Sequence, residues 1–202
     1  EGRFRVWTNK DVTKSEGMQW PAEDLEKAIA ADTVGVGAKR IHPGGITQIV
    51  ETRHGRIMAA AGIDMAKVPD GVALGLPLDP DASAQRLCVG LRARFGVTLG
   101  VIVTDTLGRP WRVGQTDVAI GAAGVIVSDD LRGGVAANGK PLQVTISVLA
   151  DELAGAADLV KGKASGIPVA IARGLGRLVV DLDAPGARTL VRSVDEDMFR
   201  FG

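Results

Sequence analysis

Residues 101–112 (VIVTDTLGRPWR) place the tightest constraint on how this chain can fold. The stretch opens with an apolar β-branched run, which is typical of a buried strand. We expect the strand to stop at Asp105 and Thr106, because the Gly-Arg-Pro sequence that follows favours a loop. Oxygen ligands at a strand end, next to Arg109 and Arg112, are typical of a Mg²⁺ or Mn²⁺ site for a phosphorylated substrate. A plain turn with two solvated arginines explains the same residues equally well.

Composition excludes several classes of protein. The 202 residues are 46% hydrophobic, enough for one substantial core or two small lobes. Lys plus Arg and Asp plus Glu both number 24, so no net field attracts nucleic acid or an acidic membrane. Cys88 is the only cysteine, which excludes an internal disulfide, and no apolar run approaches the ~20 residues that span a bilayer. We therefore expect a cytoplasmic chain with no nucleic-acid or membrane partner.

Strand patterns outnumber helix patterns, and the two do not alternate strictly, so the expected class is α+β, with mixed β-sheets and flanking helices. The expected helices cover residues 21–31, 83–95 and 151–160. The expected strands include residues 4–8, 34–39, 47–52, 125–127, 142–148, 167–172, 178–182 and 189–191.

Three further segments carry candidate functional residues. Asp64 follows a run of small residues, where it can meet another acid across a groove, although a turn or helix-cap role is also open. Lys10 and Lys14 lie in a polar loop that can grip phosphate or simply be solvated. Residues 161–166 (KGKASG) are glycine-rich but too short and misordered for a Walker A loop.

Five segments in order resemble the coenzyme F420:L-glutamate ligase family over nearly the whole chain. They are NKDVTKSEG (9–17), AAAGID (59–64), LPLDPDASA (76–84), residues 101–124 and residues 150–175. The resemblance implies the γ-glutamyl ligase-like fold, an intertwined homodimer and a GTP-dependent amide ligase. Such an enzyme joins L-glutamate to coenzyme F420-0 through an acyl phosphate, then adds further γ-linked glutamates, with Mg²⁺ or Mn²⁺ and in some cases K⁺.

The same resemblance assigns roles to individual residues. Asp64 and Asp105 match catalytic, metal-binding positions of the family, and Thr106 matches a further metal-binding position. The nucleotide-binding positions fall on Asn9, Lys14, Lys67, Lys161, Gly162, Lys163, Ala164, Ser165, Gly166, Ile167 and Pro168. Arg109 and Arg112 are candidates for binding the phosphodiester or carboxylates of the substrate, with a packing role as the alternative.

This chain also departs from the family pattern. We expect residues 1–202 to form one domain of this family without the segment, including a Gly-Leu-Pro-Glu-like turn, with which the family normally begins. Asn9 replaces a serine, Ala66-Lys67 replaces a Ser-Asn pair, and Ala136 replaces an acid. The ammonium of Lys67 is a candidate to take a metal's electrostatic place beside Asp64. Three functions stay open: this ligase, an amide ligase with another acceptor, and a non-catalytic homologue that serves as a binding or dimerisation partner.

Overall fold

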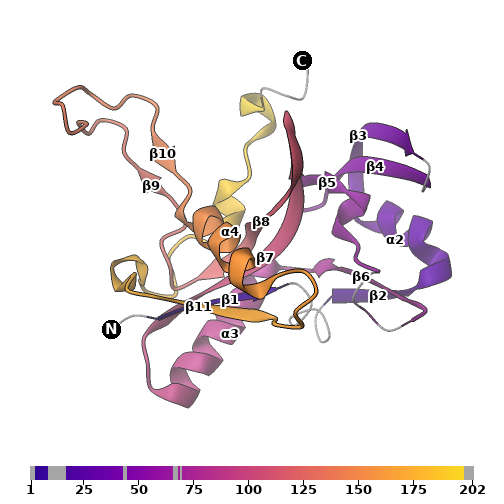
Figure 1. The fold of residues 1–202 in the computed structure, drawn as a ribbon, viewed down its shortest axis with the longest axis horizontal. Helices are drawn as coiled ribbons and strands as arrows, with labels where there is room; N and C mark the ends of the chain where they lie inside the picture. The colour runs from indigo at the N-terminus through magenta and orange to yellow at the C-terminus, as the bar shows by residue number, and fades with distance from the viewer. Residues whose placement is uncertain (1–2, 9–16, 43–44, 66–67, 69, 198–202) are drawn as a thin grey trace.

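A computed structural model describes residues 3–8, 17–42, 45–65, 68 and 70–197 of the chain. Its centre is a four-stranded sheet in the order β11-β1-β7-β8 (Figure 1). The strands are β1 (Arg3–Thr8), β7 (Leu99–Arg109), β8 (Arg112–Ala123) and β11 (Val169–Arg173). β1 runs parallel to β7, whereas β11 and β8 run antiparallel to their neighbours. The sheet is therefore mixed, in agreement with the expected α+β class with mixed β-sheets.

One helix covers each face of this sheet (Figure 1). Helix α3 (Pro80–Phe95) packs Ala84 and Cys88 against Val101 and Val103 of β7. Helix α4 (Leu149–Lys161) packs its alanines against the opposite face, where Ile102 lies. Successive residues of β7 thus alternate between the two helices, as the two-residue period of a strand demands.

Smaller sheets flank this centre. β2 (Gly17–Pro21) pairs with β6 (Val72–Pro77), and β3 (Thr33–His42), β4 (Gly45–Thr52) and β5 (Ile57–Ala59) form a third sheet beside α2 (Leu25–Asp32). β9 (Asp129–Asp130) and β10 (Ile146–Ser147) begin and end a long arm that projects from the centre (Figure 1). Short 3-10 helices lie at Ala22–Asp24, Ala60–Gly62, Gly176–Leu178, Ala187–Leu190 and Val194–Glu196.

Several expectations about local structure are wrong. β7 does not stop at Asp105 but continues to Arg109, because the antiparallel ladder with β8 supplies its hydrogen bonds. Residues 125–127 make a single bridge, Val125 to Val179, because Gly124 turns the chain at a φ of 65°. The expected strand at 189–191 is the 3-10 helix Ala187–Leu190, and the one at 178–182 is irregular beyond Leu178.

Helix α3 begins three residues earlier than expected, since Asp79 caps it by accepting from the Ala82 amide at 3.0 Å. Asp81, in the first turn, therefore does not cap the helix and can bond to other segments. Its carboxylate accepts from the amides of Ala122 on β8 at 2.8 Å, and of Ala187 and Arg188 at 2.8 and 3.0 Å. One side chain therefore fastens the C-terminal segment to the outer edge of the sheet.

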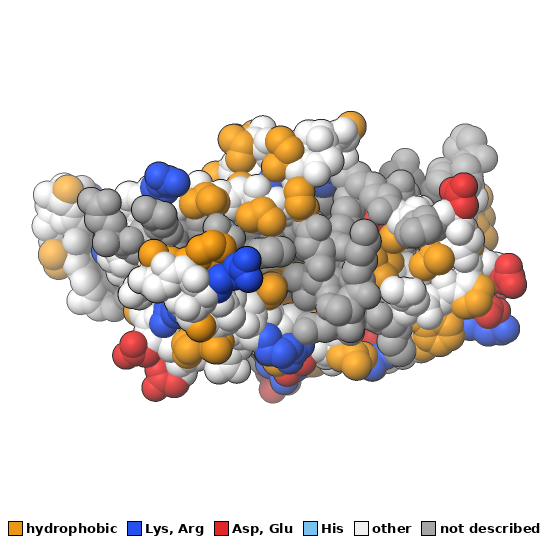
Figure 2. Space-filling view, turned by 90° about the horizontal axis from the view of Figure 1, so that it is seen from below, with side chains coloured by type: hydrophobic (Ala, Val, Ile, Leu, Met, Phe, Trp, Pro, Cys, Tyr) orange, Lys and Arg blue, Asp and Glu red, His pale blue; other side chains and the backbone are white. Residues whose placement is uncertain are grey.

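Charged side chains of both signs are interspersed with apolar ones on the face shown in Figure 2. This distribution agrees with the equal numbers of acidic and basic residues. Among the described residues, no helix combines the length and the apolar character that crossing a bilayer requires.

Replacing Asp81 tests its role in joining three segments. Asp81→Ala removes one acceptor shared by three amides, two of them half-buried, so we expect the free energy of unfolding to fall by about 2–4 kcal/mol. Urea denaturation measures the change, and Asp183→Ala, at an exposed position, is the matched control. A loss no greater than that of the control would contradict the assignment.

Candidate active site

The side chains of the central strand divide the site between two faces of the sheet. Asp105 pairs with Val118 and continues the row of Val101 and Val103, on the α3 side. Thr106 pairs with Asp117 and lies, like Thr104, on the α4 side. The two predicted ligands Asp105 and Thr106 are adjacent in sequence, but their side chains therefore point in opposite directions.

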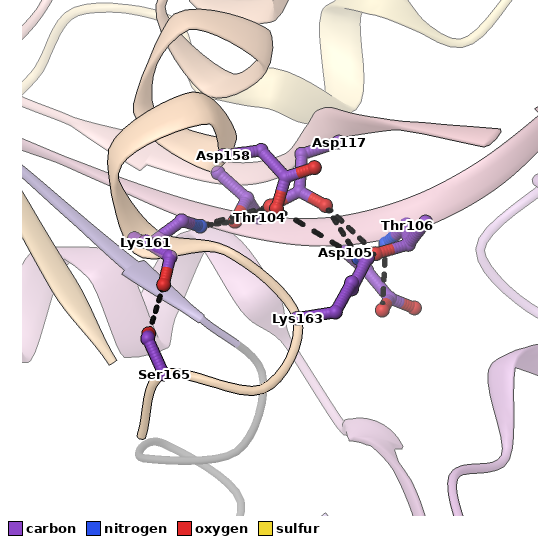
Figure 3. Close-up of polar contacts among 8 residues, drawn as sticks. All are labelled: Thr104, Asp105, Thr106, Asp117, Asp158, Lys161, Lys163 and Ser165. Atoms are coloured by element: carbon purple, nitrogen blue, oxygen red, sulfur yellow. Dashed lines mark hydrogen bonds and ion pairs between the residues drawn. The ribbon is translucent and has the colours of Figure 1, made fainter. Parts of the chain in front are cut away.

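On the α4 side, the ammonium of Lys161 lies inside the protein. Its side chain is 2% exposed and forms an ion pair with Asp117, itself 4% exposed, at 2.8 Å. The Lys161 ammonium also donates to the hydroxyl of Thr104 at 3.1 Å, and that hydroxyl donates to Asp117 at 3.1 Å (Figure 3). The Lys161 side chain is thus a buried structural cation, and a direct bond from its ammonium to a nucleotide would require breaking this network.

Asp117 accepts from several donors at once. Thr106 donates its hydroxyl to the second carboxylate oxygen at 2.7 Å. Burial alone would raise the pKa of Asp117, but the hydrogen bonds from Lys161 and Thr106 and the lysine charges outweigh it, so the pKa lies below its usual value. Asp117 is consequently ionised at neutral pH. Sequence reasoning missed this residue because a strand of small residues gives no sign of a buried acid.

Lys163 approaches the same group from the loop that follows α4. Its ammonium donates to the hydroxyl of Thr106, and it lies 3.4 Å from an Asp117 oxygen and 3.8 Å from an Asp158 oxygen (Figure 3). The side chain is 54% exposed. Lys163 therefore faces solvent on one side and three protein oxygens on the other.

The predicted nucleotide-binding loop after α4 is exposed from Gly162 to Pro168. Gly162 ends the helix at a φ of 59°, and Gly166 has a φ of 72°, a region that favours glycine. Ser165 donates to the carbonyl of Lys161 and accepts from the amide of Ile167, which folds the loop back on the helix end. The loop thus lies beside Thr106 and Asp117.

On the α3 side, Asp105 is a carboxyl group in an unfavourable place for a charge. Burial raises its pKa to about 7, against the opposing hydrogen bond from the Thr106 amide at 2.8 Å. The negative charges of Asp117 and Asp64 raise the pKa further, whereas Lys163 lowers it. Burial is thus the main cause of the raised pKa of Asp105, and the charge of Asp64 adds to it.

Asp64 is held by a strained turn. The 3-10 turn Ala60–Gly62 before it has positive φ at Ala60 (50°) and Ala61 (54°). A side chain on Gly62 would meet Met58 at 2.6 Å and Leu76 at 3.0 Å. The Asp64 backbone then closes two hydrogen bonds with Leu74, both 2.9 Å long. The absence of a side chain on Gly62 is thus needed for the turn that leads into Asp64.

This pair of acids suits a divalent cation. Repulsion between two half-buried carboxylates, one with its pKa raised to about 7, is relieved by a positive charge placed between them. Mg²⁺ is commonly held by one or two carboxylates, with water and phosphate oxygens completing its ligands. Within the described ranges, no group of three or more His, Cys, Asp or Glu side chains is placed to hold a metal unaided.

The other predicted site residues that the structure describes, Arg109 and Arg112, lie farther from Asp105 along the strands. Arg109 and Arg112 pair at the β7–β8 turn, roughly 13 Å along the strand from Asp105. Arg109 donates to the carbonyl of Val113 at 3.3 Å. Asn9, Lys14 and Lys67 lie outside the described residues.

A groove of about 610 Å³ runs along the outer edge of β8. Its lining includes Leu107 and Val118, which neighbour Asp105 in the sheet, but not Asp105 itself. Arg188 and other residues of the C-terminal segment also line it, as does Arg56, which is buried and donates to the carbonyl of Ile120. Sequence reasoning missed both arginines, because no local motif connects positions so far from Asp105 in the chain.

Comparison with known proteins identifies the family of the chain. The family model described as F420-0:Gamma-glutamyl ligase matches residues 22–174, which is more than half of the chain. The chain belongs to the F420-0:gamma-glutamyl ligase family. The resemblance inferred from the five sequence segments is therefore confirmed. The family match contains Asp64, Asp105 and the loop after α4, whereas Asn9 and Lys14 precede it.

Curated relatives from three organisms share one name. Proteins called "Coenzyme F420:L-glutamate ligase" are 47% identical in Methanopyrus kandleri, 44% in Methanothermobacter thermautotrophicus and 38% in Methanocaldococcus jannaschii. The matches cover 75% of this chain in each case, and 61%, 60% and 60% of the respective relatives. The chain thus spans about three fifths of the length of these γ-glutamyl ligase relatives.

The buried ion pair of the site can be tested by removing its cation. Lys161→Met leaves the charge of Asp117 short of its main partner, so we expect a loss of about 3–5 kcal/mol in the free energy of unfolding. Adding Asp117→Asn should recover at least about 1 kcal/mol, because no buried charge then lacks a partner. Urea denaturation measures both, with exposed Lys140→Met as control. A double variant no more stable than the single one would contradict this explanation.

The raised pKa of Asp105 predicts a dependence of stability on pH in metal-free protein. Because the folded pKa of about 7 exceeds the usual 3.8, ionisation of Asp105 lowers the stability as pH rises between these values. Asp105→Asn should therefore unfold like the wild type below pH ~4 and be more stable by about 1–3 kcal/mol above pH ~7. Thermal denaturation in EDTA across this range measures the difference. A constant difference at every pH would contradict the assignment.

Proposed function

We propose that this chain is a GTP-dependent ligase that joins L-glutamate to coenzyme F420-0 and then adds γ-linked glutamates. Membership of the family supports the ligase class, and the relatives are called coenzyme F420:L-glutamate ligases. The observation that carries the proposal for this chain is a buried carboxyl, Asp105, adjacent in the strand to Thr106, which the lysine of the exposed loop after α4 contacts. Two acids brought together from distant segments are costly unless a cation is to be bound there.

The chemistry requires activation of a carboxylate. An oxygen of the acceptor carboxylate forms a bond to the γ-phosphorus of GTP as the bond to GDP breaks, which gives an acyl phosphate. The amine of glutamate then bonds to the acyl carbon, phosphate leaves, and the amine proton passes to solvent. Mg²⁺ or Mn²⁺, held by Asp64 and Asp105, would neutralise phosphate charge when bound. None of these steps needs a covalent enzyme nucleophile, and Cys88 is buried against Leu99 in the core.

The protein's own groups would position the reactants. The exposed loop Gly162–Pro168 offers backbone amides to phosphate oxygens, and Lys163 places a positive charge at its start. The groove along β8 would take part of the acidic acceptor, with Arg56 and Arg188 among its walls. Lys161 acts as a positioning residue, because it holds Asp117 and through it Thr106.

The proposed enzyme is a homodimer. Apolar side chains at two projecting places support this: Trp111 and Val113 at the β7–β8 turn are 88% and 99% exposed, and Val135 and Val144 on the arm are 70% and 86% exposed. A second copy would remove these surfaces from water. A cytoplasmic location and a contribution from K⁺ stay predictions.

Product formation tests the proposal directly. Purified protein is incubated with F420-0, GTP, Mn²⁺ and L-glutamate, and mass spectrometry follows the addition of glutamate residues. We expect wild-type turnover, and a loss of at least about 100-fold in Asp64→Asn and Asp105→Asn, because each removes half of the proposed charge on the cation site. Asp183→Asn is the matched control at an exposed position.

The other outcomes point to the two alternative functions. Release of GDP only with a different pair of acid and amine would show that the acceptor is another acid and not F420-0. No turnover with any pair, in protein that folds cooperatively, would identify a non-catalytic homologue.

A further inference from the structure

The α4 side of the sheet contains a cation position made of protein oxygens. The hydroxyl of Thr106, one oxygen of Asp117 and one oxygen of Asp158 all face the same point. The ammonium of Lys163 occupies that point (Figure 3). A hydroxyl and two carboxylates are hard oxygen donors of the kind that bind divalent cations, but here they surround a side chain of the same protein.

The hydrogen bonds of this cluster leave little for a metal to use. Thr106 donates its only hydrogen to Asp117 and accepts from Lys163, so its hydroxyl is already engaged twice. The other oxygen of Asp117 accepts from Lys161 at 2.8 Å. A divalent ion entering here would displace Lys163 and still face the Lys161 ammonium, which is buried and cannot move away.

Phosphoryl transfer from a triphosphate calls for more than one positive charge around the transferred group. We propose that Lys163 is a built-in second cation, so that this chain binds one divalent metal, at Asp64 and Asp105, and uses an ammonium where a second metal would lie. This inference rests on the proposed function, because it assigns the charges of that same site. Thr106 then orients the ammonium rather than binding a metal through its hydroxyl.

The position of Lys163 suits this role. It lies one residue beyond Gly162, where the chain leaves α4 and enters the exposed loop. Half of its side chain is open to solvent, in contrast to the enclosed Lys161. An ammonium placed in this way can contact a phosphate oxygen without unfolding the loop.

Counting bound Mn²⁺ tests the inference without relying on activity. We titrate the full chain with Mn²⁺ alone and measure bound ions per chain by electron paramagnetic resonance. The wild type should bind one. Lys163→Glu exchanges the ammonium for a fourth oxygen ligand and should bind a second, with an affinity at least tenfold higher than any second ion on the wild type. Lys163→Met, which removes the charge without adding a ligand, should admit a second ion more weakly than Lys163→Glu.

Lys140→Glu is the matched control, because Lys140 is exposed on the arm, and it should keep the wild-type count. Two Mn²⁺ ions on the wild type, or a single ion on both Lys163 variants, would overturn the inference even if glutamate transfer proceeds. Asp105→Asn should abolish the single wild-type ion. A wild type that binds no Mn²⁺ rejects the Asp64–Asp105 site itself, and absence of glutamate transfer rejects the proposed function whatever the ion count.

Discussion

The structure of the site depends on one buried ion pair, between Lys161 at the end of α4 and Asp117 on β8. A charge of either sign enclosed between a helix and a sheet is unfavourable by several kcal/mol, so each residue requires the other. The pair fixes the end of α4 against the sheet. It thereby determines where the loop after α4 begins, how Thr106 is turned and where Lys163 can reach. The part of the proposed site that would bind the nucleotide, the loop after α4 with Lys163, thus depends on this contact.

The proposed metal site at Asp64 and Asp105 depends on a different constraint. Asp64 and Asp105 come from separate segments, and their charges repel, so the fold must hold them together by other means. It does so with the positive φ angles of Ala60–Gly62 and with the rigid ladder of β7 and β8. Strain and repulsion concentrated in one place are typical of a site prepared for a ligand. A cation at Asp64 and Asp105 would remove the repulsion, whereas on the opposite side of β7 the charges are already balanced within the protein.

Local patterns in the sequence predicted the parts of this architecture that local physics determines. The apolar run of β7, the hairpin of β3 and β4, and the amphipathic pattern of α4 each appear close to the expected positions. The joint role of Asp64 and Asp105 as metal ligands, which the sequence also suggested, stays a prediction. The end of β7 was predicted wrongly, since pairing with β8 overrides the preference of Gly-Arg-Pro for a loop. Burial of Lys161 and the partners of Asp117 depend on strand register, which no motif encodes.

The placement of β1 has a consequence for how the molecule is made. This early strand lies between β7, which begins at Leu99, and β11, which begins at Val169. Both of its hydrogen-bonding edges must therefore stay unpaired until much of the chain has left the ribosome. During that interval the nascent chain exposes a strand that can join the wrong neighbour. Because β1 precedes both of its neighbours in the chain, the sheet closes only through contacts between residues far apart in sequence, which slows folding.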